Sequence, residues 1–596
     1  ISTDLNRILA DSSPKTPVFL LLSDNRHPIR MIRKLRSGRH TDRSNGINMF
    51  SLIDEDFEKI VHSIELSLKD GCWVVIQNCH FCSNAKENLE KIYFLVSNTN
   101  DVNEDFRLFF TSEPVPTLGS LVPGNSIKFV MEPPKDIKDQ LLNLLQNTCV
   151  SRELFENGVP GKDTSFSKLL YAVIFLVTKF NGRNMFGSQG WSLATFFNEI
   201  DSEFGINSLQ TVLKMFEGIN YNAITFMIKN CLFQHRTQDS QDKILLECLV
   251  DEIINDKVIS VNRFRLSDSP HFFVPNKILY SDFIDVVKDL PQKTGHEVFN
   301  VSKFSEHSFC VKGAVFLIES LIETYSIAKK PIECDLSSYL GQLIERDQSL
   351  SGEDCKALEW VITEEIEKYR FIKDNLLEGL KQLDVQLKGQ EFLDPKSEEL
   401  LRYLTRLNTP HKWKQVAGMG QEENAQRFMD SIFSNLQYIM NLDVNTGIDI
   451  STFLEPLRLI KGARINFCEA ESVLYNQTII NVTLLSGFPQ DYEYNHKSIL
   501  LTGLELEFAS FSFKEGSLQQ CTDSSQQTVP YLLIEFSCSS DTVDPEANFY
   551  ACPLYATSSR QDYSGNSSLV LHLPIPTTVP PAELVKAGAA IIITQS

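Results

Sequence analysis

The first 135 residues alternate short apolar runs with amphipathic stretches. Apolar runs lie in residues 17–22, 73–76 and 106–114; polar residues follow the first two runs, and the third stretch is apolar and then polar at its C-terminal end. Between the runs, apolar residues recur at helical spacing at Ile60, Ile64, Leu68, Leu89 and Ile92. Uninterrupted runs rich in β-branched and aromatic residues are typical of strands that are covered on both faces. Strands that alternate with helices predict a parallel α/β sheet, whose ligands bind at the carboxyl ends of the strands.

The polar residues after these runs lie on the edge where a nucleotide's phosphates would bind. They are Ser23, Asp24, Gln77, Asn78 and Ser112. In P-loop ATPases an acidic pair at this point holds Mg²⁺ and orients water, whereas Gln77 and Asn78 are neutral. The turn at residues 23–28 has no Gly and no Lys, and G-x-x-x-x-G-K-[ST] occurs nowhere in the chain. The sequence therefore predicts a degenerate nucleotide pocket that binds no cofactor or metal, has no catalytic residue and does not hydrolyse ATP by itself.

Residues 136–325 have a helical pattern. Ile137, Leu141 and Leu144 share one face of an amphipathic helix, and residues 169–177 form a strongly apolar helix. Two glycines in residues 186–191 would allow a tight turn that brings Trp191 onto these helices. We expect Trp191 to be a core anchor, because large aromatic side chains contribute most when they are buried.

A longer helical pattern begins at about residue 351. Its apolar stripe consists of Ile362, Ile366, Tyr369, Ile372, Leu376, Leu380, Leu383 and Leu387. A single stripe without a paired copy is more typical of a helix packed in a bundle than of a coiled coil. A second amphipathic run contains Phe428, Ile432, Leu436 and Ile439.

The last 120 residues change to strand-like segments. These segments cover residues 479–485, 499–506, 531–536 and 569–573, and Gly, Pro, Asp and Ser turns separate them. This spacing predicts a small antiparallel barrel or sandwich.

Length and charge restrict the number of domains and the kinds of partner that the chain can have. A chain of 596 residues predicts three or four domains. The formal charge of −21 argues against a nucleic-acid partner, which needs a basic surface. No apolar run reaches the roughly 18 residues of a membrane span, so we expect no membrane partner. The first residue is Ile1 and no signal-peptide pattern follows, so we expect a piece of a longer protein.

The cysteines are scattered along the chain and include one close pair. Thirteen Cys without a framework suit a reducing compartment. Cys79 and Cys82 are formally C-x-x-C, but a zinc site needs a second pair, and none has suitable spacing. We expect them to be buried thiols at the end of a strand.

Several motifs resemble those of one family. Residues 13–17 are similar to S-P-x-T-P, and residues 71–80 are similar to G-x-W-V-x-L-Q-N-x-H. Further matches follow in the same order at residues 106–114, 132–135, 186–191, 197–199, 295–300, 387–389, 410–413, 502–504, 550–555 and 587–595. Through these motifs the chain resembles the C-terminal end of a dynein heavy chain, with the sixth AAA+ module followed by the C-terminal domain.

Two stretches depart from the family pattern. Residues 233–242 keep Asp239 and Asp242 but lack both glycines of Y-G-G-R-V-T-D-x-x-D, so a positive φ is costlier there. We therefore carry no family role over to this loop. Residues 448–456 lack the small-residue turn of W-[IL]-S-G-F-F-F-P-Q. These departures favour a divergent, axonemal heavy chain over the cytoplasmic form.

The resemblance implies a multidomain fold of α/β, α and β parts. A degenerate AAA+ α/β subdomain would cover residues 1–135, and a helical lid subdomain would cover residues 136–325. The C-terminal domain would have a helical part at residues 326–475 and a small antiparallel β-barrel at residues 476–596.

The resemblance also implies a function and partners. The chain would be a non-catalytic part that closes and braces the AAA+ ring of an ATP-driven, minus-end-directed microtubule motor of ciliary and flagellar movement. ATP and Mg²⁺ would bind earlier modules, and an upstream stalk would bind microtubules. Partners would be the other AAA+ modules and the dynein intermediate, light intermediate and light chains, in the cytoskeleton of the ciliary axoneme.

Two alternatives belong to other classes. An independent nucleotide-binding AAA+ protein would bind or hydrolyse ATP through Gln77 or Asn78. An acidic helical adaptor or scaffold would use the helix near residues 355–389 to bind a partner, and it predicts that Ile366, Ile372 and Leu380 are exposed.

Overall fold

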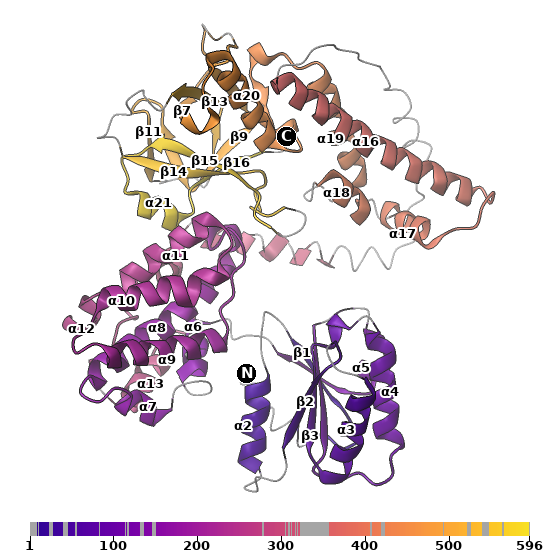
Figure 1. Cartoon of the computed structure of the whole chain (residues 1–596), viewed down its shortest axis with the longest axis vertical. Coiled ribbons are helices and arrows are strands. Elements are labelled where there is room, and N and C mark those ends of the chain that lie inside the picture. The colour runs from indigo at the N-terminus through magenta and orange to yellow at the C-terminus, as the bar shows by residue number, and fades with distance from the viewer. Residues whose placement is uncertain are drawn as a thin grey trace.

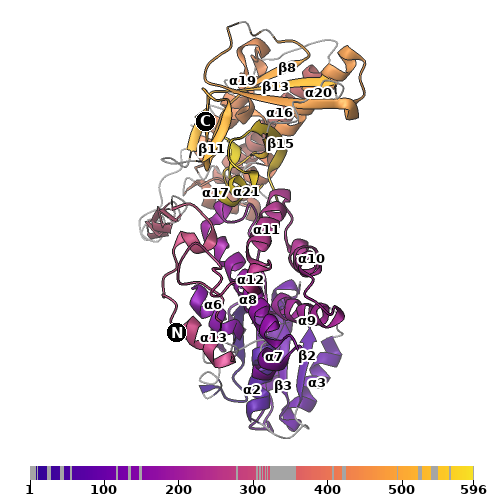
Figure 2. The same ribbon diagram turned by 90° about the vertical axis from the view of Figure 1, so that its left-hand side faces the viewer.

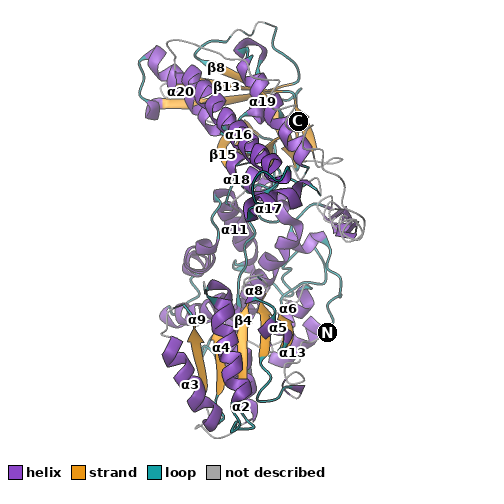
Figure 3. Cartoon of the chain, turned by 90° about the vertical axis from the view of Figure 1, so that its right-hand side faces the viewer, coloured by secondary structure: helices purple, strands orange, loops and turns teal. Residues whose placement is uncertain are grey.

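The computed structural model describes residues 9–321 and 357–594, apart from short gaps. The gaps are residues 10, 23–27, 40–45, 54–56, 83, 114, 116–117, 132–135, 146–150, 277–278, 304–305, 308–309, 312, 316, 319, 406–407, 419–423, 491, 493, 521–525, 539–547 and 563–565. Two expected site residues, Ser23 and Asp24, and the motif at residues 132–135 therefore lie outside the described residues. An α/β unit lies at one end of the molecule, a helical unit in the middle and the C-terminal region at the other end (Figure 2 and Figure 3).

The α/β unit, in which Figure 1 labels β1, β2 and β3, has five parallel strands in the order β2-β3-β4-β1-β5. The strands are β1 Val18–Leu22, β2 Ile47–Ser51, β3 Trp73–Gln77, β4 Arg107–Ser112 and β5 Ile127–Met131. The helices are α2 Ile29–Arg39, α3 Phe57–Asp70, α4 Ala85–Asn98 and α5 Leu121–Gly124. The predicted parallel α/β sheet is confirmed, and β2 and β5 are two edge strands that the apolar pattern did not reveal.

The central strand β3 is apolar from Trp73 to Ile76 because both of its faces are covered there. Trp73 and Val75 point to the face covered by α2, where they pack in a cluster with Ile32. Val74 and Ile76 point to the opposite face and pack in the cluster that includes the apolar stripes of α3 and α4. This two-sided burial explains the uninterrupted run in the sequence.

The middle unit is helical, as predicted. Its helices are α6 Ile137–Asn143, α7 Arg152–Asn157, α8 Asp163–Arg183, α9 Glu199–Met215, α10 Tyr221–Phe226, α11 Ser240–Ile253, α12 Lys257–Ser260 and α13 Tyr280–Lys288. Helix α8 runs through the centre of the unit, and no residue of 169–177 is more than 1% exposed. The strongly apolar helix of the sequence is therefore the core element of this unit.

The C-terminal region begins with a helical bundle. Its helices are α16 Ala357–Leu387, α17 Pro395–Leu404, α18 His411–Ala417, α19 Ala425–Met440 and α20 Pro456–Glu471. Helix α16 packs against α19 and α20, and Ile372 and Leu380 are buried. The predicted bundle is confirmed. The adaptor hypothesis predicts that these two residues are exposed, and that prediction is wrong. Leu387 is 47% exposed, so the stripe ends before the last turn of α16.

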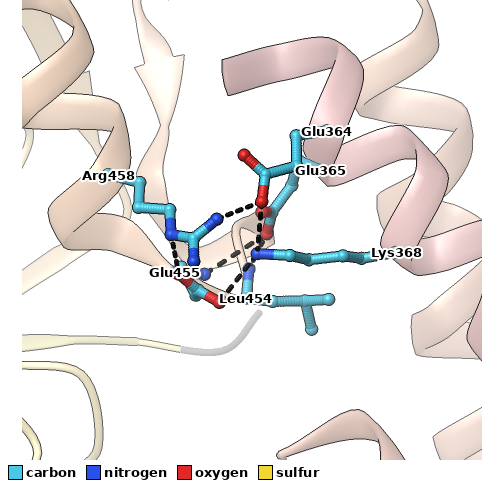
Figure 4. A network of polar contacts seen from close by, with 6 residues as sticks. All are labelled: Glu364, Glu365, Lys368, Leu454, Glu455 and Arg458. Carbon is cyan, nitrogen blue, oxygen red and sulfur yellow. Dashed lines mark hydrogen bonds and ion pairs between the residues drawn. The ribbon is translucent and has the colours of Figure 1, made fainter. Parts of the chain in front are cut away.

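A network of charged groups fastens α16 to the start of α20 (Figure 4). The buried carboxylate of Glu365 accepts hydrogen bonds from the backbone N–H groups of Leu454 and Glu455. Lys368 Nζ lies 2.7 Å from the Glu455 carboxylate and 3.6 Å from that of Glu364. The two contacts of Glu365 satisfy backbone N–H donors just before and at the N-cap of α20, which the helix itself cannot satisfy.

The chain ends in a β region. Its elements are β6 Ile448–Asp449, β7 Thr478–Leu485, β8 Ser498–Thr502, β9 Leu504–Glu507, β10 Ala509–Ser512, β11 Ser517–Gln520, β12 Gln526–Val529, β13 Tyr531–Cys538, β14 Phe549–Tyr555, β15 Leu569–Pro576, α21 Pro581–Ala587 and β16 Ala590–Ile593. The described strands form sheets in the orders β12-β9-β16-β14-β15, β6-β8-β13-β7 and β10-β11. The strand-rich end is thus confirmed, while a closed barrel is not.

The pairing of these strands also differs from the prediction. Most pairs are antiparallel, but β14 pairs with β16 in parallel, and β6 pairs with β8 in parallel. The first exception arises because α21 lies between β15 and β16 and returns the chain in the direction of β14. The edge strands β7 and β15 of the two larger sheets pack next to each other.

Candidate functional site

The expected nucleotide edge lies at the carboxyl ends of β1, β3 and β4. Leu21 of β1 is paired with Ser112 of β4, and Ile76 of β3 is paired with Phe110. Strand β4 lies between the other two, so the structure brings Gln77, Asn78 and Ser112 to one edge. Strand β1 ends immediately before Ser23 and Asp24, for which the structure gives no placement.

The polar groups at this edge bond to one another. Asn78 has a left-handed backbone with φ of 49°, and its N–H donates to Thr111 Oγ1 at 3.0 Å. Ser112 is fully buried, and its hydroxyl donates to the carbonyl oxygen of Glu113 at 2.9 Å. The N–H of Glu113 donates to His80 Nδ1 at 3.2 Å. A phosphate site needs free N–H donors, and these N–H groups already have partners within the fold.

Of the cysteine pair next to this edge, the expectation of a buried thiol is confirmed for Cys79 and wrong for Cys82, which is half-buried. Cys79 is buried, and burial raises the pKa of its thiol to about 12. A thiol with such a pKa stays protonated at neutral pH and is a poor nucleophile and metal ligand. In the part of the chain that the structure describes, no three His, Cys, Asp or Glu side chains are grouped so that they could hold a metal ion.

Trp191 is the core anchor that the sequence predicts. Its side chain is 2% exposed, and its indole N–H donates to the carbonyl oxygen of Phe180 in α8 at 2.8 Å. The ring meets the Phe180 ring edge-on, with centroids 5.7 Å apart. Gly187 has φ of 55° and ψ of −132° in the preceding turn, a conformation that requires glycine.

The loop after residue 233 has a structural role that sequence reasoning missed. Both carboxylate oxygens of Asp242 accept backbone hydrogen bonds, from Ser192 N at 2.8 Å and from Leu193 N at 3.0 Å. Burial raises the pKa of Asp242 to about 7, although these two donors oppose the shift. Asp239 caps α11 by accepting from the N–H groups of Gln241 and Asp242. The missing glycines cause no backbone strain in this loop, because no residue of 233–242 has a positive φ.

A signal for this role was present in the sequence. Asp239 and Asp242 are three residues apart and come directly before an apolar stretch, which is the pattern of a helix N-terminus.

Among the described residues, no helix is long and apolar enough to cross a bilayer.

A parallel sheet in the order β2-β3-β4-β1-β5 followed by a helical lid defines a module of the AAA+ class. Family models for three dynein heavy chain regions match in succession. They are the region D6 P-loop domain at residues 13–130, the AAA lid domain at residues 166–304 and the C-terminal domain at residues 319–593. The chain therefore belongs to the dynein heavy chain family.

Curated relatives agree with this assignment. Dynein axonemal heavy chain 12 of Rattus norvegicus is 25% identical over 617 residues, which is 99% of this chain and 20% of the relative. Dynein axonemal heavy chain 3 of Homo sapiens is 24% identical, over 98% of this chain and 15% of the relative. Dynein-1-beta heavy chain, flagellar inner arm I1 complex, of Chlamydomonas reinhardtii is 21% identical, over 99% of this chain and 13% of the relative. The chain spans a fifth or less of the length of these relatives.

Proposed function

We propose that this chain is a non-catalytic C-terminal part of a dynein heavy chain. It closes and braces the AAA+ ring of an ATP-driven motor that moves toward microtubule minus ends and powers ciliary and flagellar movement. The observation that supports this best is the succession of three dynein regions along the chain. The sheet edge of the first region has no hydrolytic residues.

The sheet edge lacks the groups that ATP hydrolysis needs. Gln77 and Asn78 stand where a P-loop ATPase has its acids, and an amide cannot hold Mg²⁺ or deprotonate water as a carboxylate does. Residues 23–28 have no Lys for the β- and γ-phosphates and no Gly to free backbone N–H groups. We infer that Gln77, Asn78 and Ser112 belong to a packing site, and that ATP with Mg²⁺ belongs to other modules of the parent chain.

The proposed domain boundaries follow the sequence prediction. The degenerate α/β subdomain covers residues 1–135, the lid 136–325, the helical part of the C-terminal domain 326–475 and its β part 476–596. We infer that the β part is a small β-barrel, and the packing of β7 next to β15, the edge strands of its two larger sheets, supports this.

The partners and location follow from the relatives, which are axonemal and flagellar heavy chains. We place the chain in the ciliary axoneme, in contact with the other AAA+ modules of its heavy chain. Microtubules would be bound through the parent's stalk, and intermediate, light intermediate and light chains are further partners.

A gliding assay tests this function. The heavy chain that carries this sequence should move microtubules with their plus ends leading. Gln77→Ala should leave both ATP turnover and gliding velocity unchanged. Absence of movement would contradict the motor function, and loss of turnover in the Gln77→Ala heavy chain would contradict the non-catalytic role.

A further inference from the structure

Helix α11 of the lid is held at its N-terminus by the C-terminal β region. The buried carboxylate of the N-cap residue Asp239 accepts hydrogen bonds from Gln241 N at 2.8 Å and from the Ser567 hydroxyl at 2.5 Å. The Tyr555 hydroxyl lies 3.2 Å from the same carboxylate and 3.0 Å from Ser192 Oγ. One carboxylate therefore caps the helix and binds the β region.

Two further contacts join α11 to the β region. Near its N-terminus, Gln241 Nε2 donates to the Tyr550 hydroxyl at 2.9 Å, and that hydroxyl donates to the Ala589 carbonyl oxygen at 2.7 Å. In its last turn, the Glu252 carboxylate lies 3.0 Å from Lys586 Nζ of α21. Helix α21 packs against α11 (Figure 1). The two ends of α11 are about 20 Å apart at 1.5 Å per residue, and a helix fixed at both ends cannot rotate against its partner.

The hydrophobic clusters also group the lid with the C-terminal region and separate both from the α/β unit. One continuous cluster contains residues of the lid, such as Leu249, together with Leu584 and Val585 of α21 and residues of the β sheets. The α/β unit has two clusters of its own, and their buried members all fall within residues 9–131. The lid thus shares its core with the C-terminal region and not with the α/β unit that precedes it in the chain.

We propose that the lid and the C-terminal β region form one rigid body, clamped along α11, which moves as a unit relative to the α/β subdomain. Rigid bodies of packed elements are the units in which conformational changes pass through proteins. A displacement of the lid would then be passed directly to the C-terminal region. This inference concerns the mechanics of this chain and does not depend on the motor function.

Amide hydrogen exchange of the unmodified chain tests the inference without any substitution. Under conditions in which each opening leads to exchange, peptides from α11, α21 and β14 should exchange with one common rate constant. Peptides from β3 and β4 should exchange with a different one. Separate rate constants for α11 and α21 would overturn the inference.

A double variant tests the clamp itself. Tyr555→Phe with Ser567→Ala removes the two hydroxyl groups at the Asp239 carboxylate, and exchange in α21 should become at least about tenfold faster, because a buried carboxylate loses two partners. The matched control, Tyr531→Phe with Ser537→Ala, removes two hydroxyl groups from β13 in the same β region and should leave exchange in α21 unchanged. Unchanged exchange in the first variant, or equal acceleration in both, would overturn the clamp.

Discussion

The turn before Trp191 provides the sharpest test of the lid's packing. A Cβ atom added at Gly190 would lie 1.7 Å from the carbonyl oxygen of Arg183. That carbonyl cannot move freely, because the Arg183 side chain donates to the carbonyl oxygens of Gly190 at 2.9 Å and of Phe299. Overpacking a core costs about 1–3 kcal/mol, and a clash with backbone belongs at the upper end. We expect Gly190→Ala to destabilise the lid by about 3 kcal/mol, which is more than a hundredfold loss of amide-exchange protection in α8.

Two other glycines serve as references for Gly190→Ala. Gly187→Ala meets no atom within 4 Å but forces a side chain into φ of 55°, which costs about 1–3 kcal/mol. Gly218→Ala meets no atom within 4 Å and has no such φ, so protection in α8 should be unchanged. A Gly190→Ala variant that lowers protection no more than Gly218→Ala does would refute the clash.

Two further predictions concern buried carboxylates. The pKa of Asp242 is raised from 3.8 to about 7 by burial, so the stability it contributes is present at low pH and is lost as pH rises through 7. Between pH 4 and pH 7.5, the unfolding free energy of the lid should therefore fall by up to about 4 kcal/mol relative to Asp242→Asn; parallel pH profiles from chemical denaturation would contradict this. Glu365→Ala should destabilise α20 by about 2–4 kcal/mol, because two N–H groups lose their acceptor, whereas Glu365→Gln should cost less, since its amide oxygen still accepts. Exchange of peptides from α20 measures both, and equal effects would show that the acceptor is irrelevant.

The sequence reveals the elements whose burial is local and complete. Helix α8 and strands β1, β3 and β4 each contain an uninterrupted apolar run because both faces are covered there, and a run of this kind is typical of a fully buried element. The edge strands β2 and β5 are covered less, so they carry polar residues such as Asn48 and Lys128 and resemble loops. The candidate nucleotide edge was predicted as far as Gln77, Asn78 and Ser112, since strand ends in a parallel sheet meet at one edge.

Residues whose hydrogen-bond partners lie far away in the sequence could not be predicted from the local pattern of residues. Glu365 lies next to the apolar stripe of α16 and would be placed at the surface, yet it is buried because it accepts from Leu454, 89 residues further along. Asp239 holds Tyr555 and Ser567, which are 316 and 328 residues away. A single sequence contains no local signal for such pairs, although the cap of α11 was visible in the spacing of its two aspartates.

Equilibrium binding of labelled ATP with Mg²⁺ to the purified chain tests the central claim most directly. We expect no saturable binding up to about 1 mM, a level that corresponds to only about 4 kcal/mol of binding free energy. Saturable binding of one ATP per chain in the micromolar range, lost on Gln77→Ala, would contradict the claim.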